Sequence, residues 1–263
     1  MGLTNKEQAP APKFGGEGQA RHEAYMYRLL VEILDDKYLA ANVFFKGGTC
    51  ARILGYLDRF SVDLDFDVKE DADKKIFRSK LYSIFNNLVF EIKDESKRAL
   101  QFFLKYLSSS GERNTIKLEF LDKIYKANKY GPQHLLPIDR TAMCQTIDTM
   151  FGHKLVALMD RYEQGGSIAG RDVYDIHHFF LQGYDYNGGV ITERRGVSVL
   201  EYFQKLRQFI NDKVVRRILE EDLNVLLEYE KFRQISKYLK QETLNFIDAE
   251  IENLKNKNAQ KVI

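Results

Sequence analysis

Two aspartates, Asp63 and Asp65, alternate with apolar residues in the segment Ser61-Val62-Asp63-Leu64-Asp65-Phe66. In an extended strand, residues two apart point to the same side, so both carboxylates would project from one polar face. Paired carboxylates suit Mg²⁺, which takes oxygen ligands together with substrate phosphates. Asp67 continues the alternation. The alternative is a solvated strand face, although aspartate is depleted in strands.

A glycine pair precedes these aspartates, in Lys46-Gly47-Gly48-Thr49. It separates a short apolar run, Val43–Phe45, from a helical pattern that we expect over Thr49–Tyr56. Glycines between a strand and a helix let the backbone approach a ligand closely. The amides that open the helix, with the Thr49 hydroxyl, would then hold phosphate oxygens. Phosphates there and a metal pair on the neighbouring strand indicate a nucleotidyl-transfer site.

A second constellation lies in later helical patterns. Lys154 and Arg161 share one face of a helix expected over Ile147–Tyr162, and Asp172 and Asp175 share a face of the next helix. Such a pattern fits a set of salt bridges between helices as well as it fits a functional site.

The elements that must position these residues divide the chain into two halves. Up to about residue 140 the patterns predict helices over 19–42, 49–56 and 71–87 and strands over 43–45, 60–68, 89–92, 100–107 and 115–121. Beyond it, helices are expected over 147–162, 171–182, 199–227 and 229–255. This order predicts an α+β fold, with a small mixed sheet in a domain over 19–140 and a helical bundle over 141–263. Residues 1–18, rich in glycine, proline and polar residues, are expected to form a flexible arm.

Composition restricts the function only weakly. The 263 residues contain 40 Lys+Arg and 38 Asp+Glu, so the net charge of +2 demands no polyanionic partner. Two cysteines and no export signal fit a cytoplasmic protein, and no apolar run is long enough to span a membrane. One stretch, Arg194–Arg217, is locally basic, with seven basic and two acidic residues. It is predicted either to bind the phosphate backbone of RNA or to form a solvated helix face.

The quoted motifs resemble those of the AbiEii/AbiGii-type toxin branch of the polymerase-β-type nucleotidyltransferases. Four blocks carry the resemblance in the family's order, namely Lys46-Gly47-Gly48-Thr49, Arg59-Phe60-Ser61-Val62-Asp63-Leu64-Asp65-Phe66, Lys154-Leu155-Val156-Ala157-Leu158-Met159-Asp160-Arg161 and Arg171-Asp172-Val173-Tyr174-Asp175. The resemblance implies transfer of a nucleotide from an NTP, with Mg²⁺ or Mn²⁺, to an acceptor hydroxyl. It also implies a nucleotidyltransferase domain followed by helices, a cognate antitoxin and, as in some members, the 3′ end of tRNA as acceptor.

The resemblance implies roles for individual residues. Asp63 and Asp65 would hold the metal, and the nucleotide would contact Lys46, Gly47, Gly48, Thr49, Ser61, Lys154 and Arg161. Lys154 would bind the triphosphate, while Asp172 or Asp175 orients it or takes the proton of the acceptor hydroxyl. In the wider superfamily a later strand often supplies a third carboxylate. Glu119, on the polar face of Thr115–Leu121, fits that role if this strand pairs with that of Asp63, and is otherwise an exposed strand charge.

Two other functions stay open at this point. One is a non-catalytic module that binds a nucleotide, RNA or a protein partner on the same fold; such proteins usually lose a metal carboxylate, whereas Asp63 and Asp65 are both present. The other is an NTP-dependent transferase whose acceptor is a protein or a small molecule.

Overall fold

A computed structural model describes residues 16–108 and 113–260, so most of the expected arm over 1–18 lies outside the described residues. The N-terminal half contains α1 (Glu17–Asp35), α2 (Lys37–Asn42), β1 (Val43–Lys46), α3 (Gly47–Ile53), β2 (Asp63–Val68), α4 (Lys74–Asn87), β3 (Glu91–Glu95), β4 (Leu100–Lys105), β5 (Thr115–Leu121), β6 (Tyr130–Leu135), a 3-10 turn (Leu136–Ile138) and β7 (Arg140–Gln145). The rest is helical: α5 (Ile147–Gly165), α6 (Gly170–Leu181), α7 (Gly188–Arg195), α8 (Val199–Lys213), α9 (Arg216–Leu223) and α10 (Tyr229–Gln260).

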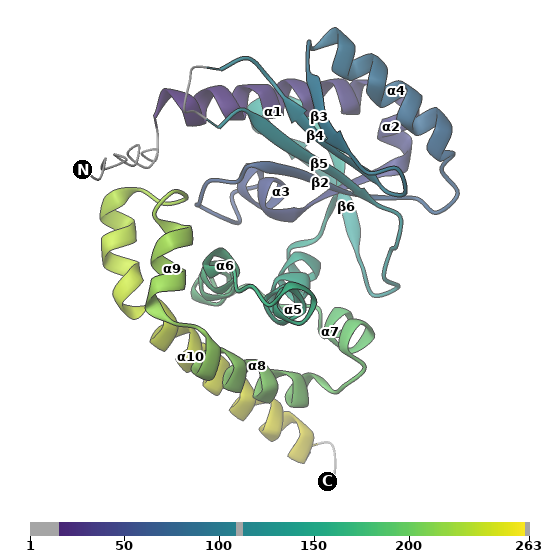
Figure 1. Ribbon diagram of the computed structural model, residues 1–263. Helices are drawn as coiled ribbons and strands as arrows, with labels where there is room; N and C mark the ends of the chain where they lie inside the picture. Colours follow the sequence, from purple (N-terminus) through teal and green to yellow (C-terminus); the bar gives the residue numbers. More distant parts are fainter. Residues whose placement is uncertain (1–15, 109–112, 261–263) are drawn as a thin grey trace, which may run out of the picture.

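The strands form one mixed sheet in the order β3-β4-β5-β2-β1-β7-β6. β2 runs parallel to β5 and β1 runs parallel to β7, whereas the other neighbours are antiparallel. Helices α1, α2 and α4 lie on one side of this sheet and the helices from α5 onward lie on the other (Figure 1). The expected α+β fold with a mixed sheet and a C-terminal helical region is therefore confirmed.

The alternation of β2 explains its place in the sheet. Leu64 and Phe66 are buried, and the Phe66 ring stacks on Phe120 of β5 at 5.0 Å between centroids. On the neighbouring strand β1, Phe45 lies 5.1 Å from Phe66. These aromatic contacts fix the strands that carry the acidic residues on their other face.

Several expected boundaries were wrong. The sheet has two strands that the sequence analysis missed, β6 and β7, so the predicted domain boundary at residue 140 falls inside the sheet. β6 contains Gly131 and Pro132 and lacks alternation; as an edge strand it tolerates a proline, which has no amide hydrogen to donate. The division of the chain into two domains stays a prediction.

The helical expectations also needed correction. The helix expected over 19–42 is two helices, because Asp36 accepts hydrogen bonds from the amides of Tyr38 and Leu39 and starts α2. The helix expected over 199–227 is α8 and α9, separated by Val214 and Val215. Helix α7 was missed because it begins with two glycines. In the described residues, no helix is both long and apolar enough to cross a membrane.

Candidate active site

The glycine loop is built so that the backbone touches an acidic side chain. Helix α3 begins at Gly47 itself, two residues earlier than expected. Gly47 has a φ of +78°, and a Cβ there would lie 2.4 Å from Oδ2 of Asp65. A Cβ on Gly48 would lie 2.9 Å from Oγ of Ser61. Side chains at either position would therefore displace the carboxylate or the serine, which explains both glycines.

Lys46 and Thr49, which the sequence analysis assigned to the nucleotide, are engaged within the protein. The Thr49 hydroxyl is buried and donates to the backbone oxygen of Asp63 at 2.5 Å, with Ser61 Oγ at 3.0 Å. Lys46 Nζ lies 2.5 Å from Oδ1 of Asp67. Both side chains therefore anchor the glycine loop to β2.

Of the three acids on the polar face of β2, Asp63 and Asp65 line one cavity, and Asp67 does not line it. Asp67 is buried and its carboxylate accepts from Lys46, from the Tyr130 hydroxyl at 2.7 Å and from Gln145 Nε2 at 3.1 Å. Burial and the neighbouring charge of Asp63 raise the pKa of Asp65 to about 6. Two close carboxylates beside a glycine loop without side chains suit a small divalent cation, whose charge would relieve their repulsion.

Glu119 lies beside this pair. Strand β5 pairs with β2 as the sequence analysis required, and Glu119 is the register partner of Asp65. Its carboxylate accepts from Gln101 Nε2 at 2.5 Å and lies 3.1 Å from Lys117 Nζ. No group of three or more His, Cys, Asp or Glu side chains in the described residues is arranged to hold a metal ion. A metal-binding role for Glu119 therefore stays a prediction.

Asp175 joins the two halves of the chain. It is fully buried and receives Nε and Nη2 of Arg59 at 2.5 and 2.7 Å. Lys154 Nζ of α5 lies 2.7 Å from the same carboxylate. Burial alone would raise the pKa of Asp175, but the charges and hydrogen bonds of Arg59 and Lys154 hold it at about 2. An acid held so firmly in its charged form orients Lys154 and is a poor proton acceptor.

Asp172 occupies the first turn of α6 and differs from Asp175 in its surroundings. Its Oδ2 lies 3.0 Å from Nε of Arg161, and Asp172 lines the cavity whereas Asp175 does not. Arg171 lines the same cavity, and it has no hydrogen-bond or ion-pair partner among residues 16–108 and 113–260. This arginine is therefore free to meet a ligand.

We call the cavity that these residues share the cleft; its volume is about 300 Å³. It brings together most of the residues predicted for the site, namely Gly47, Gly48, Ser61, Asp63, Asp65, Glu119, Lys154, Arg161 and Asp172. Lys46, Thr49 and Asp175 lie outside it. Arg59, Lys117 and Arg171 belong to the site and had no predicted role; the first and last stand inside the quoted motifs, which was the only signal for them.

The basic residues of the stretch Arg194–Arg217 are largely paired with acidic residues, some half-buried and most at the surface. Six of its seven basic residues form ion pairs with acids: Arg194 with Asp160, Arg195 with Asp160 and Glu163, Lys205 with Glu201, Arg207 with Asp248, Arg216 with Glu220 and Arg217 with Glu221. The seventh, Lys213, lies over the ring of Tyr162. The ion pairs are compatible with a solvated helix face, and RNA binding by this stretch stays a prediction.

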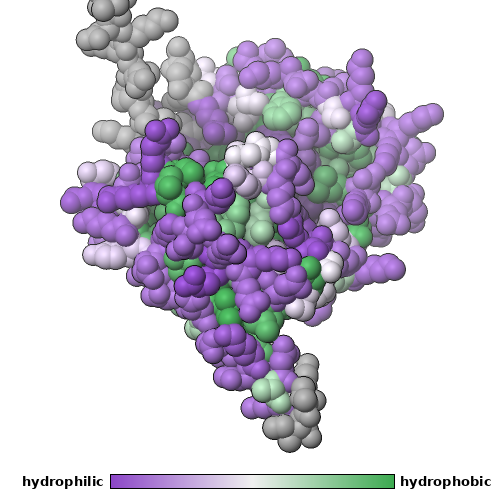
Figure 2. All heavy atoms as spheres, turned by 60° about the horizontal axis from the view of Figure 1, so that its bottom comes forward, coloured by the Kyte–Doolittle hydropathy of each residue, from purple (hydrophilic) through white to green (hydrophobic). Residues whose placement is uncertain are grey.

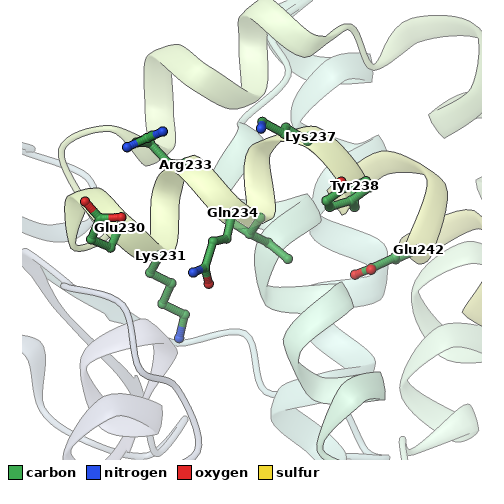
Figure 3. Close-up of a pocket in the computed structure, with 8 residues that line it drawn as sticks. Glu230, Lys231, Arg233, Gln234, Lys237, Tyr238 and Glu242 are labelled. Atoms are coloured by element: carbon green, nitrogen blue, oxygen red, sulfur yellow. The ribbon is translucent and has the colours of Figure 1, made fainter.

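A second hollow, of about 540 Å³, lies along the N-terminal part of α10 (Figure 3). Lys231 reaches from it to Asp58, which also accepts from the Tyr174 hydroxyl at 2.7 Å. None of the residues predicted for the site lines this hollow. Most of the molecular face in Figure 2 is hydrophilic.

Comparisons with known proteins agree with this geometry. The family model described as "Nucleotidyl transferase AbiEii toxin, Type IV TA system" matches residues 28–249. JHP933 from Helicobacter pylori has a similar structure, with a TM-score of 0.56 at 20% identity over 93% of this chain and 97% of its own. MenT4, a nucleotidyltransferase toxin from Mycobacterium tuberculosis, has a TM-score of 0.50 at 17% identity over 90% of this chain and 87% of its own. None of the curated proteins matches the sequence.

Proposed function

The chain belongs to the AbiEii family of nucleotidyl transferase toxins, and from this premise we propose that it transfers a nucleoside monophosphate from an NTP to a hydroxyl group of RNA in a Mg²⁺-dependent reaction. The observation that carries the proposal is the cleft, where two carboxylates from the sheet and three cations from α5 and α6 face one space. Carboxylates alone would repel a triphosphate, whereas cations alone would not recruit a metal. Their combination suits a metal-bound NTP.

We assign the donor side of the reaction to the charged residues of the cleft. Asp63 and Asp65 would hold Mg²⁺ (or Mn²⁺), which supplies charge neutralisation at the α-phosphate when it is bound. Lys154, oriented by Asp175, would contact the phosphates, and so would Arg161 and the unpaired Arg171. Gly47, Gly48 and Ser61 line the same space.

We assign the acceptor side to Asp172. Of the two acids in the α6 motif it is the one that lines the cleft, so it can accept a hydrogen bond from an acceptor hydroxyl. The attack of that hydroxyl on the α-phosphorus releases pyrophosphate. Asp175 would act as a positioning residue, because its carboxylate is buried between Arg59 and Lys154.

The assignment of RNA as the acceptor, and of the 3′ end of tRNA in particular, rests on the family resemblance and not on a surface feature. A cytoplasmic location and a cognate antitoxin rest on the same basis. The non-catalytic alternative is disfavoured because the family consists of transferases and the cleft retains both carboxylates.

The test is incubation of the protein with each α-labelled NTP, Mg²⁺ and total RNA, followed by separation of RNA and protein on gels. We expect label in an RNA band, which EDTA and Asp63→Asn both abolish. Label in a protein band would instead support the alternative of a protein acceptor. Absence of any labelled product with all four NTPs, whatever the acceptor fraction, would contradict the proposed reaction.

A further inference from the structure

The first turns of α10 combine basic and aromatic residues. The segment Tyr229–Lys240 contains four basic residues and a single acid, Glu230. Two of its aromatic residues, Tyr229 and Tyr238, are 64% and 59% exposed. Cations interleaved with exposed aromatic rings are typical of surfaces that bind nucleic acid, because the cations contact phosphates and the rings stack on bases.

Two of the cations have no carboxylate partner. Arg233 and Lys237 are exposed, and neither forms an ion pair with any residue that the structure describes. They lie four residues apart and project from the same side of α10 (Figure 3). Two like charges at this spacing cost helix stability, so the folding of α10 does not explain them. Their charges are therefore available to a polyanion.

The exposed rings stand beside these cations. The guanidinium of Arg233 lies over the Tyr229 ring at 5.7 Å, a contact that orients the cation and leaves its charge unneutralised. Tyr238 follows Lys237 directly and lines the same hollow as both cations. We call Tyr229, Arg233, Lys237 and Tyr238 the α10 face.

The α10 face begins next to the cleft. Lys231, in the first turn of α10, forms an ion pair with Asp58, which directly precedes Arg59 of the cleft. Leu226, three residues before α10, lines the cleft as well. Lys237 lies six residues beyond Lys231, about 9 Å along the helix axis. A chain that enters the cleft can therefore continue along the α10 face.

An acceptor RNA has to place one hydroxyl in the cleft while the rest of its backbone lies outside. That backbone carries a phosphate at every nucleotide, and its bases offer flat faces for stacking. We propose that the α10 face binds the acceptor RNA, with Arg233 and Lys237 at phosphates and Tyr238 stacked on a base. Continuity with the cleft, where the acceptor hydroxyl must arrive, favours RNA over an acidic protein. This inference rests on the proposed function, because it requires RNA as the acceptor.

The test is the double substitution Arg233→Glu with Lys237→Glu in the full-length protein. Both side chains are exposed, so the fold should stay intact. In the transfer reaction the apparent KM for total RNA should rise at least about 10-fold, while the KM for NTP stays within about 2-fold, because only phosphates of the acceptor lose contacts.

Binding of labelled total RNA to the protein on filters, without NTP, supplies a second measurement. The slope of log affinity against log KCl should fall by about 1.4 in the double variant, since each phosphate contact on a single strand contributes about 0.7. Tyr238→Ala should weaken binding at least about 5-fold and leave that slope unchanged, because stacking releases no counterions.

Lys255→Glu with Lys257→Glu is the matched control. These two lysines are exposed on the same helix and change the charge by the same amount, but they lie about 30 Å further along its axis. Their RNA affinity and salt slope should equal those of the wild type.

An unchanged KM and salt slope in the Arg233 and Lys237 variant would overturn the inference and leave the α10 face to an acidic protein. An equal loss in the control would overturn it too, since total charge alone would then attract RNA. If the wild-type protein labels no RNA with any NTP, the proposed function itself fails. Filter binding requires no transfer and keeps the two failures apart.

Discussion

The ion pairs around Asp175 predict that substitutions at two contacting residues, Asp175 and Lys154, damage different properties of the protein. Asp175→Asn removes the carboxylate that Arg59 and Lys154 both contact, whereas Lys154→Met removes one cation and leaves the bidentate pair of Arg59 and Asp175 intact. We therefore expect Asp175→Asn to damage the stability of the fold and Lys154→Met to damage turnover.

The structure sets the magnitudes. The pKa of Asp175 falls from 3.8 to about 2, which corresponds to about 2 kcal/mol of stabilisation of the folded state. Because the folded-state pKa is the lower one, this stabilisation is complete above the unfolded value and is lost as the pH falls towards 2. Asp175→Asn also leaves the buried Arg59 cation without its partner, so the expected loss at pH 7 is about 3–5 kcal/mol.

Lys154 is partly exposed and its Asp175 partner keeps Arg59, so Lys154→Met should change the unfolding free energy by no more than about 1 kcal/mol. Loss of a cation that stabilises transition-state charge costs about 2–4 kcal/mol, or about 30- to 1,000-fold in turnover. Lys117→Met is the control, because Lys117 also lines the cleft and also has a carboxylate partner, Glu119.

Urea unfolding and nucleotide transfer should be measured on the same preparations. A Lys154→Met protein with full turnover would show that the lysine only closes a salt bridge. An Asp175→Asn protein as stable as the wild type would refute the idea that this carboxylate holds the two cations together.

Three further outcomes follow from the same geometry. Asp63→Asn and Asp65→Asn should each abolish nucleotide transfer while the circular dichroism spectra stay unchanged. Without metal, the Asp65→Asn protein should melt no lower than the wild type at pH 8, because a carboxylate with a raised pKa costs stability when it is ionised. The affinity for Mg²⁺, measured by titration, should fall as the pH drops through about 6, since protons then compete for Asp65. An affinity that does not change between pH 8 and pH 5 would count against Asp65 as a ligand. Gly47→Ala should reduce transfer by at least 10-fold, about 1.4 kcal/mol, because the new Cβ meets the Asp65 carboxylate. Gly55→Ala is the control for backbone strain alone, since Gly55 is also at positive φ but its Cβ would have no atom within 4 Å.

The parts of the site that the sequence could reveal are those with local patterns. Strand alternation placed Asp63, Asp65 and Glu119 on polar faces, and helical spacing placed Lys154 and Arg161 together; all of them line the cleft. The same logic could not separate Asp67 from its two neighbours. Its carboxylate is covered by Tyr130 and Gln145, which come from strands that have no alternation to detect.

The contacts that define the cleft join residues that are distant in sequence, and no periodicity encodes them. Arg59 and Asp175 are separated by 116 positions, and the amide of Phe60 donates a hydrogen bond to the carbonyl of Leu226, which lies in the last part of the chain. Arg59 stood inside a recognised motif, yet only its burial against Asp175 shows what it does. Sequence patterns therefore predicted which faces are polar, and the tertiary packing decides which polar groups remain available for a ligand.

The basic stretch Arg194–Arg217 shows a related effect of tertiary packing. A local surplus of basic residues indicates a polyanion site only if those residues are not already neutralised, and here the acids lie elsewhere, as with Asp160 of α5 and Asp248 of α10. Arg171 shows the converse: this arginine opens one of the quoted motifs but had no predicted role, and it is the cleft cation without a partner in the described part of the chain. For an enzyme that must bind a triphosphate, one unpaired cation that lines the cleft together with Asp63 and Asp65 is worth more than several that the fold has already paired, because its charge is still available to the substrate.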